Sequence, residues 1–187
     1  LADNYLAHAA VGPDHRICVY GASGSIGSAA VQLAKRHYGA HVTAVTTAAT
    51  VELVRSLGAD EVIDHESVDF TRTGATYDVV LDAVGKRTYG QCRRLLVPRG
   101  TYYHTDLGPG WQNPFLALAT AKLPVRRLGF PLPHYTQARA ELAATLLAAG
   151  TYRAVIDRTY PLDELAEASR YVETGRKVGN VVVAVRP

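Results

Sequence analysis

The stretch that decides the fold lies at residues 16–35 and reads RICVYGASGSIGSAAVQLAK. Its first part is rich in β-branched and aromatic residues, which favours a strand, and its last part is rich in Ala, which favours a helix. Between them stands the pattern G-x-x-G-x-x-G. This order suits a dinucleotide pyrophosphate, because glycine lets the backbone turn sharply and a helix start offers free N–H groups. A tight turn in another α/β protein is the alternative interpretation.

The bulk properties fit one α/β domain with a small appendage. The chain has 187 residues, of which 48% are hydrophobic, and its formal charge is +3 from 20 basic and 17 acidic residues. This excess is too small to indicate nucleic acid, and no apolar run approaches the roughly 18 residues of a membrane span. Cys18 and Cys92 lie far apart and are expected in the core. We therefore predict a cytoplasmic protein that binds a small-molecule substrate and neither nucleic acid nor membrane.

The beginning of the chain indicates a piece of a longer protein. The sequence starts at Leu1 and contains no methionine. Residues 1–11 lack the basic start and long apolar run of a signal peptide. We expect residues 1–8 to form the end of a helix instead.

Strands and helices are expected to alternate through the first 150 residues. The predicted strands are Ile17–Tyr20, His41–Thr46, Glu61–Ile63, Asp78–Asp82, Gly100–His104 and Val125–Gly129. The predicted helices are Ser25–His37, Thr50–Leu57, Tyr89–Leu95, Phe115–Lys122 and Thr136–Ala149, with a loop over residues 105–114. This alternation predicts an α/β fold of the Rossmann type, with a doubly wound six-stranded parallel sheet.

The pattern changes after Gly150. We expect a short strand over Asp157–Tyr160, a helix capped by Asp163 that runs to Thr174, and a buried strand over Val178–Val185. Since the sheet already has its six strands, this strand-helix-strand tail is assigned to a second structural unit that is otherwise missing. The predicted division is residues 1–150 and 151–187.

Five stretches, in this order, carry a family resemblance. They are residues 19–35 (VYGASGSIGSAAVQLAK), 52–64 (ELVRSLGADEVID), 77–85 (YDVVLDAVG), 160–168 (YPLDELAEA) and 175–183 (GRKVGNVVV). Together they resemble the cofactor-binding half of the medium-chain dehydrogenases/reductases, in the quinone oxidoreductase-like, zinc-independent branch. The resemblance implies an NAD(P)-dependent oxidoreductase that transfers hydride to a quinone, enone or related carbonyl substrate.

The resemblance has further implications for partners and metal. It implies a catalytic domain before this segment, onto which the C-terminal segment folds, so that the fragment alone is expected to be inactive. Members with catalytic zinc take their ligands from that other half, and no zinc is expected here. Lys177 and Asn180 are implied to approach the cofactor. Subunits of the family commonly pair through an edge strand, which here is Val125–Leu128.

Residues at the ends of four predicted strands are expected to hold the cofactor. In an open α/β sheet, ligands collect where the parallel strands end. We predict contacts from Gly21, Ala22, Ser23, Gly24, Ser25, Ile26, Gly27, Thr46, Thr47, Ala83, Val84, Gly85, His104 and Thr105. His104 could equally be a solvated loop histidine. We predict no catalytic side chain, because hydride chemistry belongs to the cofactor.

The end of the second strand favours NADP over NAD. An NAD site usually has Asp or Glu there to accept from the ribose hydroxyls, whereas this chain has Thr46, Thr47 and Thr50. Ala48 and Ala49 stand where NADP-using relatives often carry Lys or Arg, so NAD remains an alternative. These threonines could also be ordinary strand and turn residues.

Other functions are less well supported. A short-chain dehydrogenase would need Tyr-x-x-x-Lys, and a P-loop hydrolase would need G-x-x-x-x-G-K-[ST]; neither pattern occurs. A methyltransferase with a glycine loop usually has an acidic residue after the second strand, which is missing here. The non-enzymatic alternative is an NAD(P)H-sensing or scaffold module.

Overall fold

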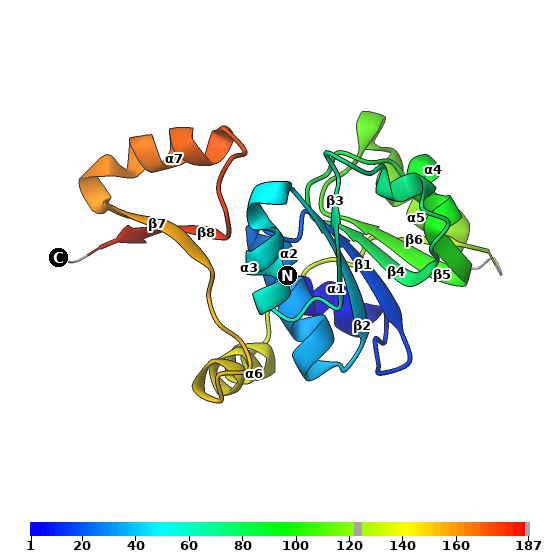
Figure 1. The fold of residues 1–187 in the computed structure, drawn as a ribbon, viewed down its shortest axis with the longest axis horizontal. Helices are drawn as coiled ribbons and strands as arrows, with labels where there is room; N and C mark the ends of the chain where they lie inside the picture. The colour runs from blue at the N-terminus through cyan, green and yellow to red at the C-terminus, as the bar shows by residue number, and fades with distance from the viewer. Residues whose placement is uncertain (122–124, 186–187) are drawn as a thin grey trace.

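The computed structural model describes residues 1–121 and 125–185. Six parallel strands form one sheet in the order β3-β2-β1-β4-β5-β6 (Figure 1). The strands are β1 Arg16–Tyr20, β2 His41–Thr46, β3 Glu61–Asp64, β4 Tyr77–Asp82, β5 Leu96–His104 and β6 Arg127–Gly129. The strand order reverses between β1 and β4, which confirms the predicted doubly wound α/β fold.

Helices cover both faces of the sheet. They are α1 Ala2–His8, α2 Ser25–Gln32 with its π-helical continuation Leu33–His37, α3 Val51–Ser56, α4 Tyr89–Cys92 and α5 Gln112–Ala121. A further helix, α6 Gln137–Ala148, lies outside α1 and α2. Successive side chains of a strand point to opposite faces. Accordingly, Ile17 and Val19 of β1 pack in the core beneath α1, α2 and α3. Cys18 and Tyr20 pack in the second core, beneath α4 and α5.

Two elements begin three or more residues earlier than predicted, and β6 begins at Arg127 rather than Val125. β5 begins at Leu96 rather than Gly100, and its pairing with β4 shifts register between Tyr77 and Val79. α5 begins at Gln112, inside the segment expected to be a loop. The buried Asn113 explains this early start, because its amide Nδ2 donates to the Asp106 carbonyl and its backbone N–H donates to Leu107. The predicted end of this helix at Lys122 lies outside the described residues.

The C-terminal tail forms a separate two-stranded parallel sheet. β7 Ile156–Pro161 and β8 Asn180–Ala184 pair with each other and are joined through α7 Leu165–Glu173. The prediction of a buried last strand is wrong, since every residue of β8 is only half-buried and Val185 is 73% exposed. The reason is visible in Figure 1, where α7 lies over one side of this small sheet only. Asp163 lies in a 3-10 turn, and Glu164 takes the N-cap position of α7.

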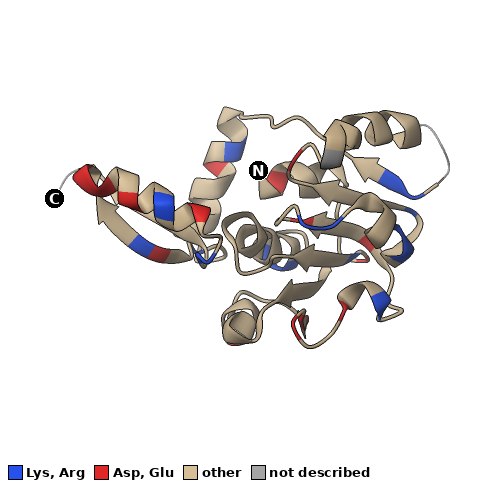
Figure 2. Cartoon of the chain, turned by 90° about the horizontal axis from the view of Figure 1, so that it is seen from above, with Lys and Arg blue, Asp and Glu red and all other residues tan. Residues whose placement is uncertain are grey.

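The charged residues are interspersed. Figure 2 shows acidic and basic residues mixed along α7 and scattered over the larger sheet in that view. Within residues 1–121 and 125–185, no helix is long and apolar enough to cross a bilayer.

Candidate dinucleotide-binding site

The turn between β1 and α2 is tightly ordered by backbone hydrogen bonds. The N–H groups of Gly21 and Ala22 both donate to the Val45 carbonyl, at 3.0 and 3.1 Å. The N–H of Gly24 donates to the Gly21 carbonyl at 3.0 Å. Gly21 has a φ of +79°, a conformation that favours glycine because a Cβ would be strained there. These hydrogen bonds therefore attach the turn to β2, and α2 begins directly after the turn.

The three glycines of the motif have different roles. A Cβ built on Gly27 would lie 2.1 Å from the carbonyl oxygen of Gly21, and one on Gly21 would lie 2.2 Å from Cγ2 of Val84. These two glycines are required by packing within the protein. A Cβ on Gly24 would meet only the Gly21 carbonyl oxygen, at 3.3 Å. The protein therefore leaves open space at Gly24, as close approach of a ligand requires.

The start of α2 is suited to an anion. Its N-cap residue, Gly24, makes no side-chain capping bond, and its first turn contains no acidic residue. The N–H groups of Ser25, Ile26 and Gly27 belong to the first turn, where no intrahelical carbonyl can accept from them. They carry the positive end of the helix dipole. A dinucleotide pyrophosphate fits the residues present.

The threonines at the end of β2 are held by hydrogen bonds among themselves. Thr46 is buried, and its hydroxyl lies 2.6 Å from the hydroxyl of Thr50, which is also buried. Thr47 is half-buried and lies 3.3 Å from Thr50 through its own hydroxyl. Contact of Thr46 or Thr47 with a cofactor stays a prediction, but the hydroxyls of Thr46 and Thr50 already have a partner in each other. They bond to each other because they meet across the turn that enters α3, and Thr47 is the one that remains partly exposed.

Sequence reasoning missed two residues at this place, Asp64 and His65. Asp64 ends β3 and pairs in register with Thr46, and the N–H of His65 donates to the Thr46 carbonyl at 3.0 Å. Hydrogen bonds from the Ser67 hydroxyl and then the Glu66 N–H lower the pKa of Asp64. An ionised carboxylate therefore lies close to the end of β2. The sequence argument considered only residues that follow β2 in the chain, whereas β3 is the spatial neighbour.

The loop after β4 meets the glycine turn. The Ala83 N–H donates to the Tyr20 carbonyl at 3.0 Å, and Val84 touches Gly21 as described above. The buried Asp82 carboxylate accepts from the N–H groups of Val84 and Gly85, at 2.9 and 2.8 Å. Asp82 therefore caps the carboxyl end of β4.

His104 ends β5 and is 2% exposed, so it is not a solvated loop histidine. Its Nε2 lies 3.1 Å from the Arg87 carbonyl oxygen, and its Nδ1 lies 3.2 Å from the Asp106 N–H nitrogen. Both ring nitrogens thus have partners within the chain, and the ring lies beneath the surface. Thr105 is half-buried at the same edge. Direct contact of either residue with a cofactor stays a prediction.

The C-terminal unit touches the glycine turn. The Gly179 N–H donates to the Ser23 carbonyl at 2.7 Å, and Gly24 and Gly179 form an isolated parallel bridge. The side chains of Ser25 and Asn180 are hydrogen-bonded. In Figure 1 these segments lie side by side although they are distant in sequence. The structure therefore places Asn180 against the start of α2.

Lys177 lies in the same segment as Asn180. Its ammonium donates to the Gly179 carbonyl at 2.8 Å. Burial lowers the pKa of Lys177, and the charge of Asp157 partly opposes that effect. A cation is thus held, partly desolvated, close to the glycine turn.

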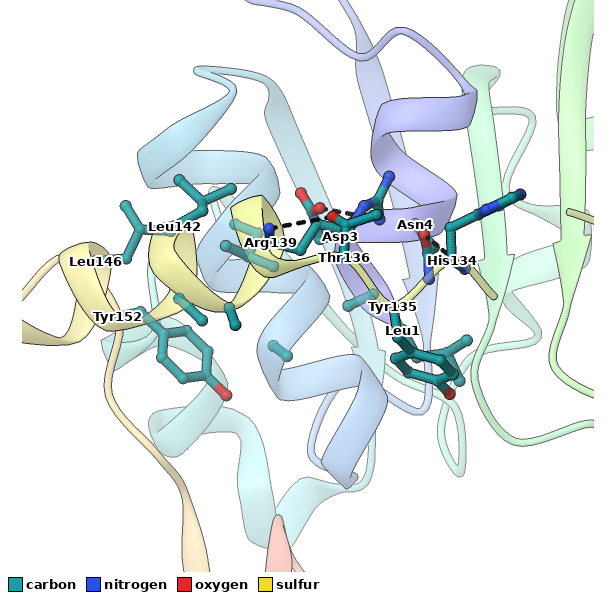
Figure 3. Close-up of a pocket in the computed structure, with 15 residues that line it drawn as sticks. Leu1, Asp3, Asn4, His134, Tyr135, Thr136, Arg139, Leu142, Leu146 and Tyr152 are labelled. Carbon is teal, nitrogen blue, oxygen red and sulfur yellow. Dashed lines mark hydrogen bonds and ion pairs between the residues drawn. The ribbon is translucent and has the colours of Figure 1, made fainter. Parts of the chain in front are cut away.

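An apolar groove of about 390 Å³ lies elsewhere, between α6 and the pair α1 and α2 (Figure 3). Ala29, Leu33, Leu142 and Leu146 contribute to its walls. None of the predicted cofactor-binding residues lines it. We assign the dinucleotide to the carboxyl edge of the sheet, because in this fold ligands bind there at the point where the strand order reverses.

A family model described as Zinc-binding dehydrogenase matches residues 57–183. The chain belongs to this family, and its curated relatives are quinone oxidoreductase-like medium-chain dehydrogenases/reductases, as the sequence motifs predicted. Within the described part of the chain, no three His, Cys, Asp or Glu side chains gather as metal ligands. The expectation that this part of the protein holds no zinc stays a prediction.

The chain is 35% identical over 193 residues to a mitochondrial NAD(P)H oxidoreductase of Mus musculus, covering 91% of this chain and 48% of that protein. It is 31% identical to a chloroplast envelope quinone oxidoreductase homolog of Arabidopsis thaliana, covering 92% and 53%. A solved quinone oxidoreductase of Coxiella burnetii superposes with a TM-score of 0.87 at 25% identity, covering 99% and 57%. The chain thus spans about half the length of these relatives. Their names place some of them in organelles, and a cytoplasmic location for this chain stays a prediction.

Proposed function

We propose that this chain is the nucleotide-binding part of an NADPH-dependent oxidoreductase that passes hydride to a quinone, enone or related carbonyl compound. The observation that carries the proposal is the uncapped start of α2, which offers its N–H groups beside the open face of Gly24. Bound NADPH supplies the hydride. The glycine turn at residues 21–27 binds the pyrophosphate. The loop at residues 83–85 lies against this turn, and the C-terminal segment brings Asn180 and Lys177 to it.

The nature of the hydride acceptor rests on similarity. Relatives are named as quinone oxidoreductases and NAD(P)H oxidoreductases. Since they are about twice as long as this chain, we propose that the acceptor site is completed by a further domain. Consumption of NADPH by a longer protein containing this chain, measured with a panel of quinones and enones, tests the activity. Binding of NADPH without turnover of any acceptor would instead favour the sensing or scaffold function.

The preference for NADPH is supported by groups that surround the end of β2. The half-buried Thr47 can donate a hydroxyl proton. His65 lies at the same place, because its backbone N–H donates to the carbonyl of Thr46. Arg87 lies over the ring of Tyr20 at the same edge of the sheet, 5.9 Å from its centroid, and Tyr20 in turn contacts His65. Asp64 opposes this preference, because its charge repels a phosphate. We expect the donors to outweigh it.

The substitution His65→Gln tests the cofactor preference. We expect it to weaken NADPH binding about tenfold and NADH binding less than twofold, because a charge-assisted hydrogen bond contributes roughly 1.5–3 kcal/mol. Calorimetric titration of both cofactors measures the difference. His37→Gln is the matched control, since His37 is exposed near the opposite edge of the sheet. Equal losses for the two cofactors, or tighter NADH binding by the unmodified chain, would contradict the preference.

We also propose a homodimer through the β6 edge. β6 ends the sheet, and α5 beside it, together with the turn before this helix, exposes Trp111, Phe115 and Leu118 at 69%, 73% and 78%. An unpaired edge strand next to an apolar surface invites association. Light scattering should give twice the chain mass of 20.1 kDa, and Leu118→Glu should restore the single mass. Leu162→Glu, at an exposed position of the tail, should leave the dimer intact. A single mass for the unmodified chain would refute the dimer.

A further inference from the structure

A network of buried polar groups connects the loop after β4 with the loop after β5. Its centre is Asp82, which is fully buried. Besides the N–H groups of Val84 and Gly85, the carboxylate accepts from the Arg87 N–H at 2.9 Å. One buried carboxylate thus holds three backbone N–H groups of the loop at residues 83–88. Leaving such groups without a partner in the interior is costly, so this loop conformation depends on Asp82.

The second part of the network comes from β5. The hydroxyl oxygen of Tyr102 lies 2.9 Å from the Arg87 carbonyl oxygen and 3.2 Å from Oδ2 of Asp82. Burial, followed by the charge of Asp82, raises the pKa of Tyr102, which keeps this hydroxyl protonated and able to donate. His104 also reaches the Arg87 carbonyl, through Nε2. A carbonyl can only accept, so Nε2 carries the proton in this contact.

The other ring nitrogen of His104 belongs to the second loop. Nδ1 accepts from the backbone N–H of Asp106, with the two nitrogens 3.2 Å apart. The two loops also touch directly, because a Cβ on Gly85 would lie 2.7 Å from Oδ2 of Asp106. One imidazole therefore joins residue 87 of the first loop to residue 106 of the second.

From this arrangement we infer that Asp82 and His104 are positioning residues that hold the two loops as one unit and thereby set the site of the nicotinamide end of NADPH. The inference rests on the proposed function and adds to it. The loops border the carboxyl ends of β4 and β5, next to the glycine turn on β1. Val84 of the first loop touches Gly21, so a shift of this unit moves the surface that faces the cofactor.

Two substitutions of His104 test separately its contact with Arg87 and its contact with Asp106. His104→Asn places an acceptor near Nδ1 but removes the donor to Arg87, whereas His104→Gln places a donor near Nε2 but removes the acceptor for the Asp106 N–H. If the loops act as one unit, each variant should weaken NADPH binding about three- to tenfold. Each should also speed amide exchange in both loops, at Gly85 as well as at Asp106.

Asp82→Asn should likewise weaken NADPH binding three- to tenfold, because an amide cannot accept from all three N–H groups. The matched control is Asp78→Asn, at the other end of β4, where the carboxylate accepts only from the Arg16 N–H at 2.8 Å among the described residues. That variant should leave the Kd within twofold. In the double variant Asp82→Asn/His104→Asn, the two losses should be smaller than additive, since both act on one unit.

The exchange measurement needs no cofactor, and it separates this inference from the proposed function. If the amide exchange rate of Gly85 is unchanged in His104→Gln, the connection between the two loops is refuted, whether or not the chain binds NADPH. Unchanged NADPH affinity in Asp82→Asn, with a lowered unfolding midpoint, would overturn the positioning role and leave Asp82 a purely structural residue. Absence of NADPH binding by the unmodified chain would refute the proposed function instead.

Discussion

Replacing Gly27 with alanine should abolish measurable NADPH binding, with a loss of at least about 100-fold. The added Cβ would lie 2.1 Å from the Gly21 carbonyl oxygen and 2.8 Å from the Ala22 Cα. Both neighbours are backbone atoms, so α2 itself has to move away from the turn. A displaced α2 no longer presents its first N–H groups to the pyrophosphate beside Gly24. Overpacking of this kind also destabilises a fold by roughly 1–3 kcal/mol, which should lower the unfolding midpoint.

Two other alanine substitutions separate loss of binding from loss of fold. Gly24→Ala adds a methyl group on the open side of the turn, where the only near atom is 3.3 Å away and φ is −76°. We expect it to keep the unfolding midpoint and still weaken NADPH binding, because the methyl group occupies the approach of the pyrophosphate. Gly90→Ala, with its nearest atom at 3.8 Å, should change neither property. Full NADPH affinity in Gly27→Ala would contradict the assigned site.

Replacing Gly179 with alanine should separate the C-terminal unit from the glycine turn. Gly179 has a φ of +73°, and its Cβ would lie 2.3 Å from the Val155 carbonyl oxygen. The Gly179 N–H would then lose its hydrogen bond to Ser23. Because Asn180 and Lys177 are brought to the turn by this segment, we expect NADPH affinity to fall about tenfold. Limited proteolysis should cut the tail faster while the six-stranded sheet stays folded.

Gly175→Ala is the control for backbone strain in the same unit. Its φ is +68°, but nothing lies within 4 Å of the added Cβ. This variant therefore carries the left-handed backbone cost of about 1–2 kcal/mol without the collision. We expect normal NADPH affinity. Equal losses in the two variants would show that the contact between Gly179 and Ser23 has no part in binding.

Much of this architecture can be predicted because it depends on local patterns. The β1 residues alternate between two buried faces, and the glycine pattern follows directly, so strand, turn and helix are readable in residues 16–35. The alternation of strands and helices likewise predicts a doubly wound parallel sheet. The last strand is different: its valines predicted burial, but burial depends on what covers a sheet, and α7 covers one side only.

The candidate site was predictable where it depends on neighbours in the chain and unpredictable where it depends on neighbours in space. The glycine turn at residues 21–27 is a continuous segment. The pairing of Thr46 with Thr50 depends on how the chain turns into α3, and Asp64 reaches the end of β2 only because β3 lies beside it. The two contacts of His104 could likewise not be predicted without knowing that the two loops meet. Such contacts leave no periodic signal in the sequence.

The most direct test of the central claim is an NMR titration of the 187-residue chain with NADPH. The account predicts saturable binding of one NADPH per chain. The largest amide shifts should fall in residues 21–27, 83–85 and 177–180, and they should be absent in Gly27→Ala. Failure to bind NADPH, or shifts confined to the groove between α6 and α2, would contradict it.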